Sequence, residues 1–161
     1  MNFIKQQSIG FYVNILALAA AVVALVYYVI NCHTSYFLSA GMNPGVLACS
    51  VGVIVLELVI LVGNQFAGAA AGSGSAGSAA GVSWLRVVLD VCVVAVSVML
   101  MCAFAFFLSD RVNSIASIAT FNQNAQNMAD LMSAIYGMIA YVVAVVLSIV
   151  ASYLKVNKRN A

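Results

Sequence analysis

Four long apolar stretches constrain this chain more than any other feature. They cover residues 9–30, 46–62, 84–108 and 131–154, and a membrane-spanning α-helix needs roughly 20 such residues. Of the 161 residues, 65% are hydrophobic and 6% are charged, whereas soluble domains carry about 25% charged residues. The sequence therefore predicts an all-α integral membrane protein, a four-transmembrane-helix bundle that forms a single domain over residues 1–161.

The segments between the apolar stretches differ in composition. Residues 63–81 consist mainly of Gly, Ala and Ser, so we expect a flexible tether there, either natural low-complexity sequence or an engineered linker. Asn43 followed by Pro44 is typical of a helix start, with Asn as the cap. Residues 109–130 are polar, yet apolar residues recur there every three positions, which predicts a short amphipathic helix in this third loop. These apolar residues are Val112, Ile115, Ile118 and Phe121.

The basic residues indicate which side of the membrane each chain end faces. If the N-terminus is inside, Arg111 is the one basic residue on the outer side. The others then lie on the inner side: Lys5, Arg86, Lys155, Lys158 and Arg159. Since Lys and Arg are retained on the cytoplasmic side, we expect a multi-pass protein of the inner cell membrane with both termini cytoplasmic.

Glu57 interrupts the second apolar stretch, where a carboxylate costs at least about 2.5 kcal/mol. Counted from the cytoplasmic ends of the stretches, Asn14, Asp90 and Ser148 lie at a similar depth, about 9 to 10 Å inside. Arg86 precedes Asp90 by four residues and therefore shares its helical face. Together these five residues predict a buried polar layer.

Two interpretations of this layer stay open. In the structural one, Arg86 pairs with Asp90 or Glu57 inside the bundle, and removing one partner costs about 3–5 kcal/mol. In the functional one, two carboxylates against one arginine leave a negative charge or a shared proton, as in proton-coupled carriers and cation sites. The structural interpretation is favoured, because charges inside small bundles also serve assembly. Both require Glu57 to face the bundle or a partner subunit.

A second set of polar residues falls on the predicted outer side. His33, Asp110, Arg111 and Asp130 could form a binding pocket or a surface for a partner. The favoured alternative is an ordinary solvated loop, because loops are polar by default.

Catalytic and metal chemistry have no visible support in the sequence. A single histidine cannot supply a bis-histidine haem or a three-ligand zinc site, and no nucleophile has a base at a suitable spacing. We therefore expect that the protein is not an enzyme and that it binds neither a metal nor a cofactor. A net charge of +2 without a long basic run argues against nucleic acid as a partner. A disulfide between Cys32 and Cys49, near the outer ends of the first two stretches, is left open.

The tract Thr120-Phe-Asn-Gln-Asn-Ala-Gln-Asn-Met-Ala-Asp130 leads into the fourth stretch. This tract resembles uncharacterised small bacterial four-span inner-membrane proteins. The resemblance implies a bacterial inner-membrane origin and no established activity.

Two functions from different classes follow. The first is a non-enzymatic bundle acting as a subunit or accessory of a larger membrane assembly, with lipid and a membrane-protein partner or further copies around it. The alternative is a small proton- or cation-coupled transporter, working as an oligomer with Glu57 and Asp90 as coupling carboxylates. A membrane enzyme acting on lipid is the weakest option.

Overall fold

The fold is all-α, as the sequence predicts. The computed structural model describes residues 8–70 and 76–154, with side chains for 8–66 and 84–154. Its elements, in chain order, are α1 (Ile9–Cys32), the 3-10 helix η2 (Leu38–Ala40), α2 (Pro44–Ala70), α3 (Ala76–Thr120) and α4 (Ala125–Tyr153). Each of the four α-helices is long and apolar enough to cross a membrane, which makes the chain a multi-pass membrane protein.

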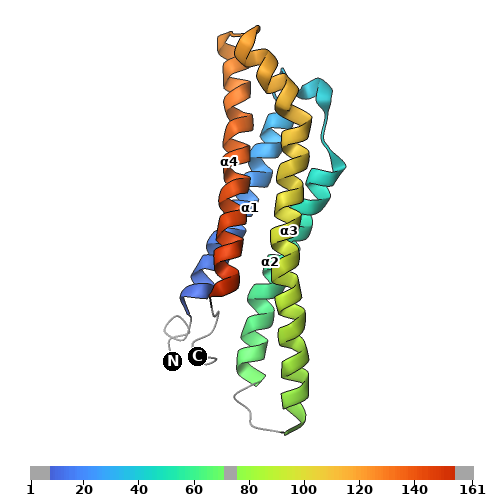
Figure 1. Ribbon diagram of the computed structural model, residues 1–161, viewed down its shortest axis with the longest axis vertical. Helices are drawn as coiled ribbons and strands as arrows, with labels where there is room; N and C mark the ends of the chain where they lie inside the picture. The colour runs from blue at the N-terminus through green and yellow to red at the C-terminus, as the bar shows by residue number, and fades with distance from the viewer. Residues whose placement is uncertain (1–7, 71–75, 155–161) are drawn as a thin grey trace.

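The four helices alternate in direction and form a bundle (Figure 1). α1 packs along α4 and α2 along α3, while α1–α2 and α3–α4 contacts join these two pairs. α1 begins and α4 ends at one end of the bundle, which we name the terminal end. The α1–α2 loop and the α3–α4 turn lie at the opposite end, which we name the loop end. At the terminal end, α2 and α3 extend beyond the other two helices (Figure 1).

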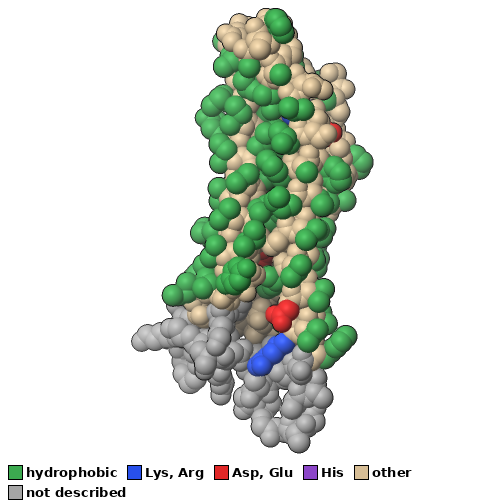
Figure 2. Space-filling model, viewed as in Figure 1, with side chains coloured by type: hydrophobic (Ala, Val, Ile, Leu, Met, Phe, Trp, Pro, Cys, Tyr) green, Lys and Arg blue, Asp and Glu red, His purple; other side chains and the backbone are tan. Residues whose placement is uncertain are grey.

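The surface and the helix contacts suit a lipid environment. All four helices carry exposed large apolar side chains. Figure 2 shows them on one face of the bundle. Between the helices, small residues allow the close approach on which helix packing in membranes depends. Gly137 of α4 is one such residue: a Cβ atom there would lie 2.9 Å from Cε1 of Phe107 and 3.4 Å from Cβ of Tyr27. α4 can therefore pack this closely on α3 and α1 only with glycine at that position.

Two helix starts follow the rules of capping. The backbone N–H of Gly45 donates to Oδ1 of Asn43 at 2.8 Å, which confirms the predicted start of α2. Asn124 caps α4, and its Oδ1 accepts from the backbone N–H of Asn127 at 2.7 Å.

The connections differ from the sequence prediction. The separate amphipathic helix predicted within residues 109–130 is wrong, because α3 continues without a break to Thr120. That segment contains no Gly or Pro to end a helix, and its apolar residue Ile118 is buried in the same core as the rest of α3. The predicted tether at residues 63–81 is also shorter than expected, since α2 runs to Ala70 and α3 begins at Ala76. Alanine, the best helix former, is frequent in both flanks, and residues 71–75 lie outside the described part.

Candidate functional site

The helix register places Glu57 at a defined depth. A Cβ atom at Gly52 would meet the side chain of Met99, and one at Gly63 would meet Leu89. Because α2 and α3 run in opposite directions, these contacts put Glu57 level with Val94 of α3. On α1, the level of Glu57 follows from the contact between Tyr28 and Asn43.

The backbone N–H of Asn43 donates to the Tyr28 hydroxyl at 2.6 Å. Asn14 and Glu57 lie fourteen residues before Tyr28 and after Asn43, respectively, along two antiparallel helices. The two side chains are therefore at the same level. On the other side of the bundle, Ser148 of α4 lies 3.1 Å, Oγ to Oγ, from Ser97 of α3.

Three of the five residues predicted for the buried polar layer are buried. They are Asn14, Glu57 and Ser148, from three different helices. α3 contributes Ser97, which is half-buried and three residues from the level of Glu57. We name these four residues the Glu57 layer.

The other two predicted members do not belong to this layer. Arg86 and Asp90 are exposed on the outside of α3, so their predicted burial is wrong. The buried face of α3 follows Leu89, Val96 and Leu100, and Asp90 is turned by about 100° from Leu89. Arg86 lies eight residues, about 12 Å along the helix, from the level of Glu57.

Glu57 is 2% exposed, and its Oε2 has no hydrogen-bond partner in the described part of the chain. Its neighbours in the layer donate to their own helices instead. Asn14 Nδ2 donates to the carbonyl of Gly10 at 2.8 Å, and Ser148 Oγ donates to that of Val145 at 2.9 Å. A buried carboxyl oxygen that lacks a donor is costly. The unpartnered carboxyl oxygen of Glu57 can therefore take up a proton or bind a small cation.

The polar residues predicted for the outer side do not form one pocket. His33 is exposed, with Nδ1 2.8 Å from the carbonyl of Val29, and Asp110 is exposed and accepts from Asn43 Nδ2 at 2.8 Å. Arg111 and Asp130 are instead almost completely buried, at 1% and 2% exposed. The predicted solvated loop is therefore wrong for these two residues.

Asp130 holds the α1–α2 loop, residues 33–43, against the loop end. Its Oδ2 accepts from the backbone N–H of Tyr36 at 2.9 Å and from Ser35 Oγ at 3.1 Å. Its Oδ1 accepts from Gln126 Nε2 at 2.9 Å. With three donors, the Asp130 carboxylate is well satisfied although it is buried.

Arg111 holds the same loop from α3. Its guanidinium carbon lies 5.0 Å from the ring centroid of Phe37, a buried loop residue, and its Nη2 donates to the carbonyl of Gly41 at 3.1 Å. Nη2 also lies 3.2 Å from Sγ of Cys32, whereas Nε and Nη1 have no hydrogen-bond partner among the described residues. We name the contacts of Asp130 and Arg111 with residues 33–43 the loop lock.

Aromatic side chains fill the interior between the loop lock and the Glu57 layer. The ring centroids of Tyr28 and Phe107 are 5.1 Å apart, and those of Phe107 and Tyr141 are 6.1 Å apart. The Tyr141 hydroxyl lies 2.7 Å from Ser50 Oγ. All of these side chains are buried in the interior of the bundle.

Several contributors to these sites were missed in the sequence. Ser97 is the only residue with a hydroxyl group between Asp90 and Ser109. A single hydroxyl within an apolar stretch could have indicated a member of the polar layer. Asn31, fully buried, donates to Ser133 Oγ at 2.9 Å, yet at the end of an apolar stretch it looks like the start of a loop.

The remaining expectations concern cysteines, metals and related proteins. All four cysteines are free, so the disulfide between Cys32 and Cys49 is not formed. Within the described ranges, no three His, Cys, Asp or Glu side chains gather as a metal site would require. In comparisons with models of known protein families, with curated proteins and with solved structures, the chain matches none. The resemblance of residues 120–130 to bacterial four-span proteins stays a prediction.

Proposed function

We propose that this protein is a small membrane carrier coupled to a proton or a monovalent cation, with Glu57 as the coupling group. The observation that carries this proposal is the buried Oε2 of Glu57, which lacks a donor inside a membrane-spanning bundle. Ionisable groups at such positions are expensive, and they commonly mark ion pathways and proton relays. The structural interpretation has lost its main support, because Arg86 and Asp90 are exposed and not part of the Glu57 layer.

The unequal surroundings of Glu57 on its two sides support a carrier. Toward the loop end, the path from Glu57 is filled by the Tyr28, Phe107 and Tyr141 rings and then by the loop lock. Toward the terminal end, α1 begins only five residues before Asn14, a distance of about 8 Å. A site close to one membrane face, with packed aromatic side chains between it and the other face, fits one state of an alternating-access cycle.

Orientation and location belong to the same proposal. In the sequence, Lys5 precedes α1, and Lys155, Lys158 and Arg159 follow α4. The start of α1 and the end of α4 both lie at the terminal end. We therefore place this end in the cytoplasm and the protein in the inner cell membrane, with the Glu57 layer near the cytoplasmic side.

The test uses everted membrane vesicles that contain the full chain and carry a pH gradient reported by a fluorescent dye. Sodium, potassium and a set of organic amines are added in turn. We expect at least one of them to dissipate the gradient with the wild type and none with Glu57→Gln. Asp110→Asn is the matched control, since it makes the same chemical change at an exposed carboxylate far from the layer. Equal responses from the wild type and Glu57→Gln, or no response from either, would refute the carrier.

A second function, a non-enzymatic subunit of a larger membrane assembly, is favoured by a different observation. The α2–α3 hairpin extends beyond α1 and α4 at the terminal end (Figure 1), and we place the contact with a partner there. A protein that stays bound through mild solubilisation, and is lost when residues 67–83 are replaced by a short turn, would support this role.

A further inference from the structure

The contact between α2 and α4 shows which side chain faces Glu57. Ser50 Oγ lies 2.7 Å from the Tyr141 hydroxyl, and these two helices run in the same direction. Glu57 follows Ser50 by seven residues, and Ser148 follows Tyr141 by the same number. Seven residues make about two helical turns, so each pair shares one face of its helix. Glu57 and Ser148 therefore face each other across the bundle at the same level.

Asn14 of α1 lies at this level too. Asn31 Nδ2 donates to Ser133 Oγ at 2.9 Å across the antiparallel helices α1 and α4. Seventeen residues along both helices from this contact, Asn14 is within two residues, about 3 Å, of the level of Ser148. Asn14, Glu57 and Ser148 are 3%, 2% and 2% exposed. The three side chains therefore meet in the interior of the bundle.

The hydroxyl of Ser148 and the amide of Asn14 donate hydrogen bonds to backbone carbonyls of their own helices. Ser148 Oγ and Asn14 Oδ1 still have lone pairs with which to coordinate a cation. Oε2 of Glu57, which lacks a donor among the described residues, adds a carboxylate oxygen. Oxygen atoms of this kind are the ligands that hard cations prefer in proteins.

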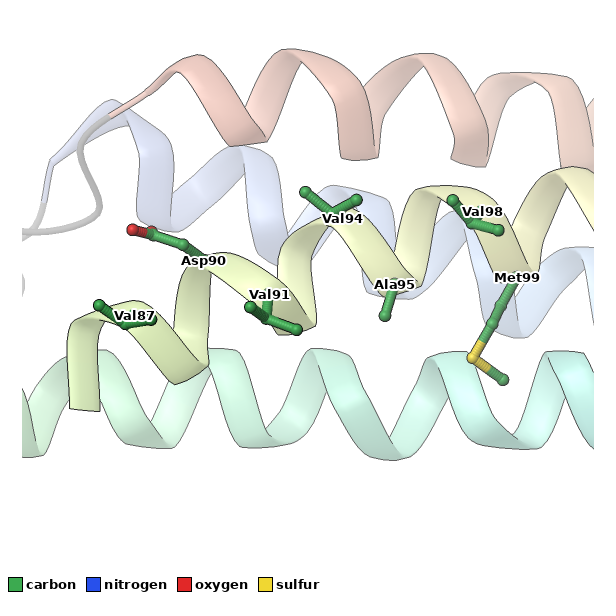
Figure 3. Close-up of a pocket in the computed structure, with 7 residues that line it drawn as sticks. All are labelled: Val87, Asp90, Val91, Val94, Ala95, Val98 and Met99. Atoms are coloured by element: carbon green, nitrogen blue, oxygen red, sulfur yellow. The ribbon is translucent and has the colours of Figure 1, made fainter. Parts of the chain in front are cut away.

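The charge of the layer fits one monovalent ion. Of the four carboxylates in the chain, Asp110 and Asp130 belong to the loop end. Asp90 lines a groove on the outside of α3 and points away from α2 (Figure 3). Glu57 therefore supplies the one negative charge, and a divalent ion would keep an uncompensated charge in the interior, which is costly. The titratable side chains nearest to Glu57 on the other helices are the half-buried Cys92, the exposed Asp90 and Tyr12, and Tyr141, which is two turns away.

Burial and charge density select the kind of monovalent ion. Each of the three side chains is at most 3% exposed, so the site suits a bare ion better than an organic cation. A carboxylate attracts sodium more strongly than potassium, because the smaller ion comes closer to the oxygen and the Coulomb energy rises as the distance falls.

We propose that the Glu57 layer binds one sodium ion through Glu57, Asn14 and Ser148, and that this ion is exchanged for one proton. The inference rests on the proposed carrier function and names its ion. When sodium binds, the O–H bond of the protonated Glu57 carboxyl breaks, the proton leaves to water at the terminal end, and the carboxylate coordinates the ion. One positive charge replaces another, so the exchange moves no net charge.

Thermal unfolding of the full chain in detergent tests the site without requiring transport. The midpoint is measured in sodium chloride and in choline chloride at the same ionic strength. At pH 8, and at a sodium concentration of about one hundred times Kd, we expect sodium to raise the midpoint by about 5–11 °C. The rise should be smaller at pH 6, because protons compete for the carboxylate, and it should be absent in Glu57→Gln.

A matched pair of serine variants tests the ligands. Ser148→Ala removes one ligand and should weaken the apparent affinity for sodium about tenfold. Ser152→Ala is the control, because Ser152 donates to a backbone carbonyl of the same helix in the same way but is exposed. It should leave the affinity unchanged. Equal effects of the two changes would overturn the site.

The outcomes separate the sodium site from the carrier. A wild-type midpoint that sodium does not raise, or an equal rise in Glu57→Gln, overturns the site, even where the vesicle assay shows a Glu57-dependent response to another additive. Stabilisation by sodium that needs Glu57 and Ser148, with no response in the vesicle assay, supports the site and refutes the carrier. A membrane potential imposed with valinomycin should not change the rate of sodium–proton exchange, and a rate that follows the potential overturns the one-for-one exchange.

Discussion

Replacing Glu57 by methionine separates a functional carboxyl from a structural one. Methionine has a similar length and volume, fills the same space and brings no polar atom that needs a donor. If Glu57 is kept for its chemistry, the bundle should become more stable without it. If Glu57 holds the helices together, the same change should destabilise them.

The expected gain follows from the unpartnered Oε2 of Glu57. A buried polar group without a partner costs about 1–3 kcal/mol, and this cost is removed with the carboxyl group. Glu57 is 2% exposed, so solvent does not reduce this value by much. For a chain of this size, 1 kcal/mol shifts the midpoint of thermal unfolding by about 2–4 °C, so we expect a rise of roughly 2–12 °C.

Thermal unfolding in detergent, followed by the fraction of monodisperse protein that remains, measures this shift. Ile60→Met on the same helix is the control, because it replaces a buried apolar side chain and should lower the midpoint slightly. Glu57→Met should also fail in the vesicle assay. A fall in the midpoint larger than that of Ile60→Met would refute the reasoning and return Glu57 to a structural role.

Two further predictions concern the loop end and the helix contacts. Asp130→Ala removes three hydrogen bonds and leaves the backbone N–H of residue 36 without its acceptor. We therefore expect the free energy of unfolding to fall by about 3–4 kcal/mol and hydrogen exchange in residues 35–41 to become faster. Asp110→Ala, at an exposed position, should cost less than about 1 kcal/mol, and equal effects of the two changes would contradict the loop lock. Gly137→Ala should destabilise by about 1–3 kcal/mol, because the new Cβ meets the packed ring of Phe107. Gly52→Ala should cost clearly less, because it meets only the flexible end of a methionine, and the order of the two thermal midpoints checks this.

Some features of the loop end could be read only in part from the sequence. Arg111 and Asp130 stand in a polar run, and polar runs between apolar stretches are usually solvated loops. The structure buries both because residues 33–43 fold back between the helix ends and bring donors to Asp130 and an aromatic ring to Arg111. These partners are more than 70 residues away along the chain, beyond the reach of any local pattern.

The sequence by itself determined that the chain forms four membrane-spanning helices and that Glu57 is buried among them. Length and hydropathy suffice for this, because lipid admits only backbones that satisfy their own hydrogen bonds. The tertiary structure alone decided which side of α3 faces inward, and so placed Ser97, not Asp90, with Glu57. The physical reason is that lipid and the bundle interior are equally apolar, so a membrane helix is hydrophobic on every face and its sequence does not mark the inner one.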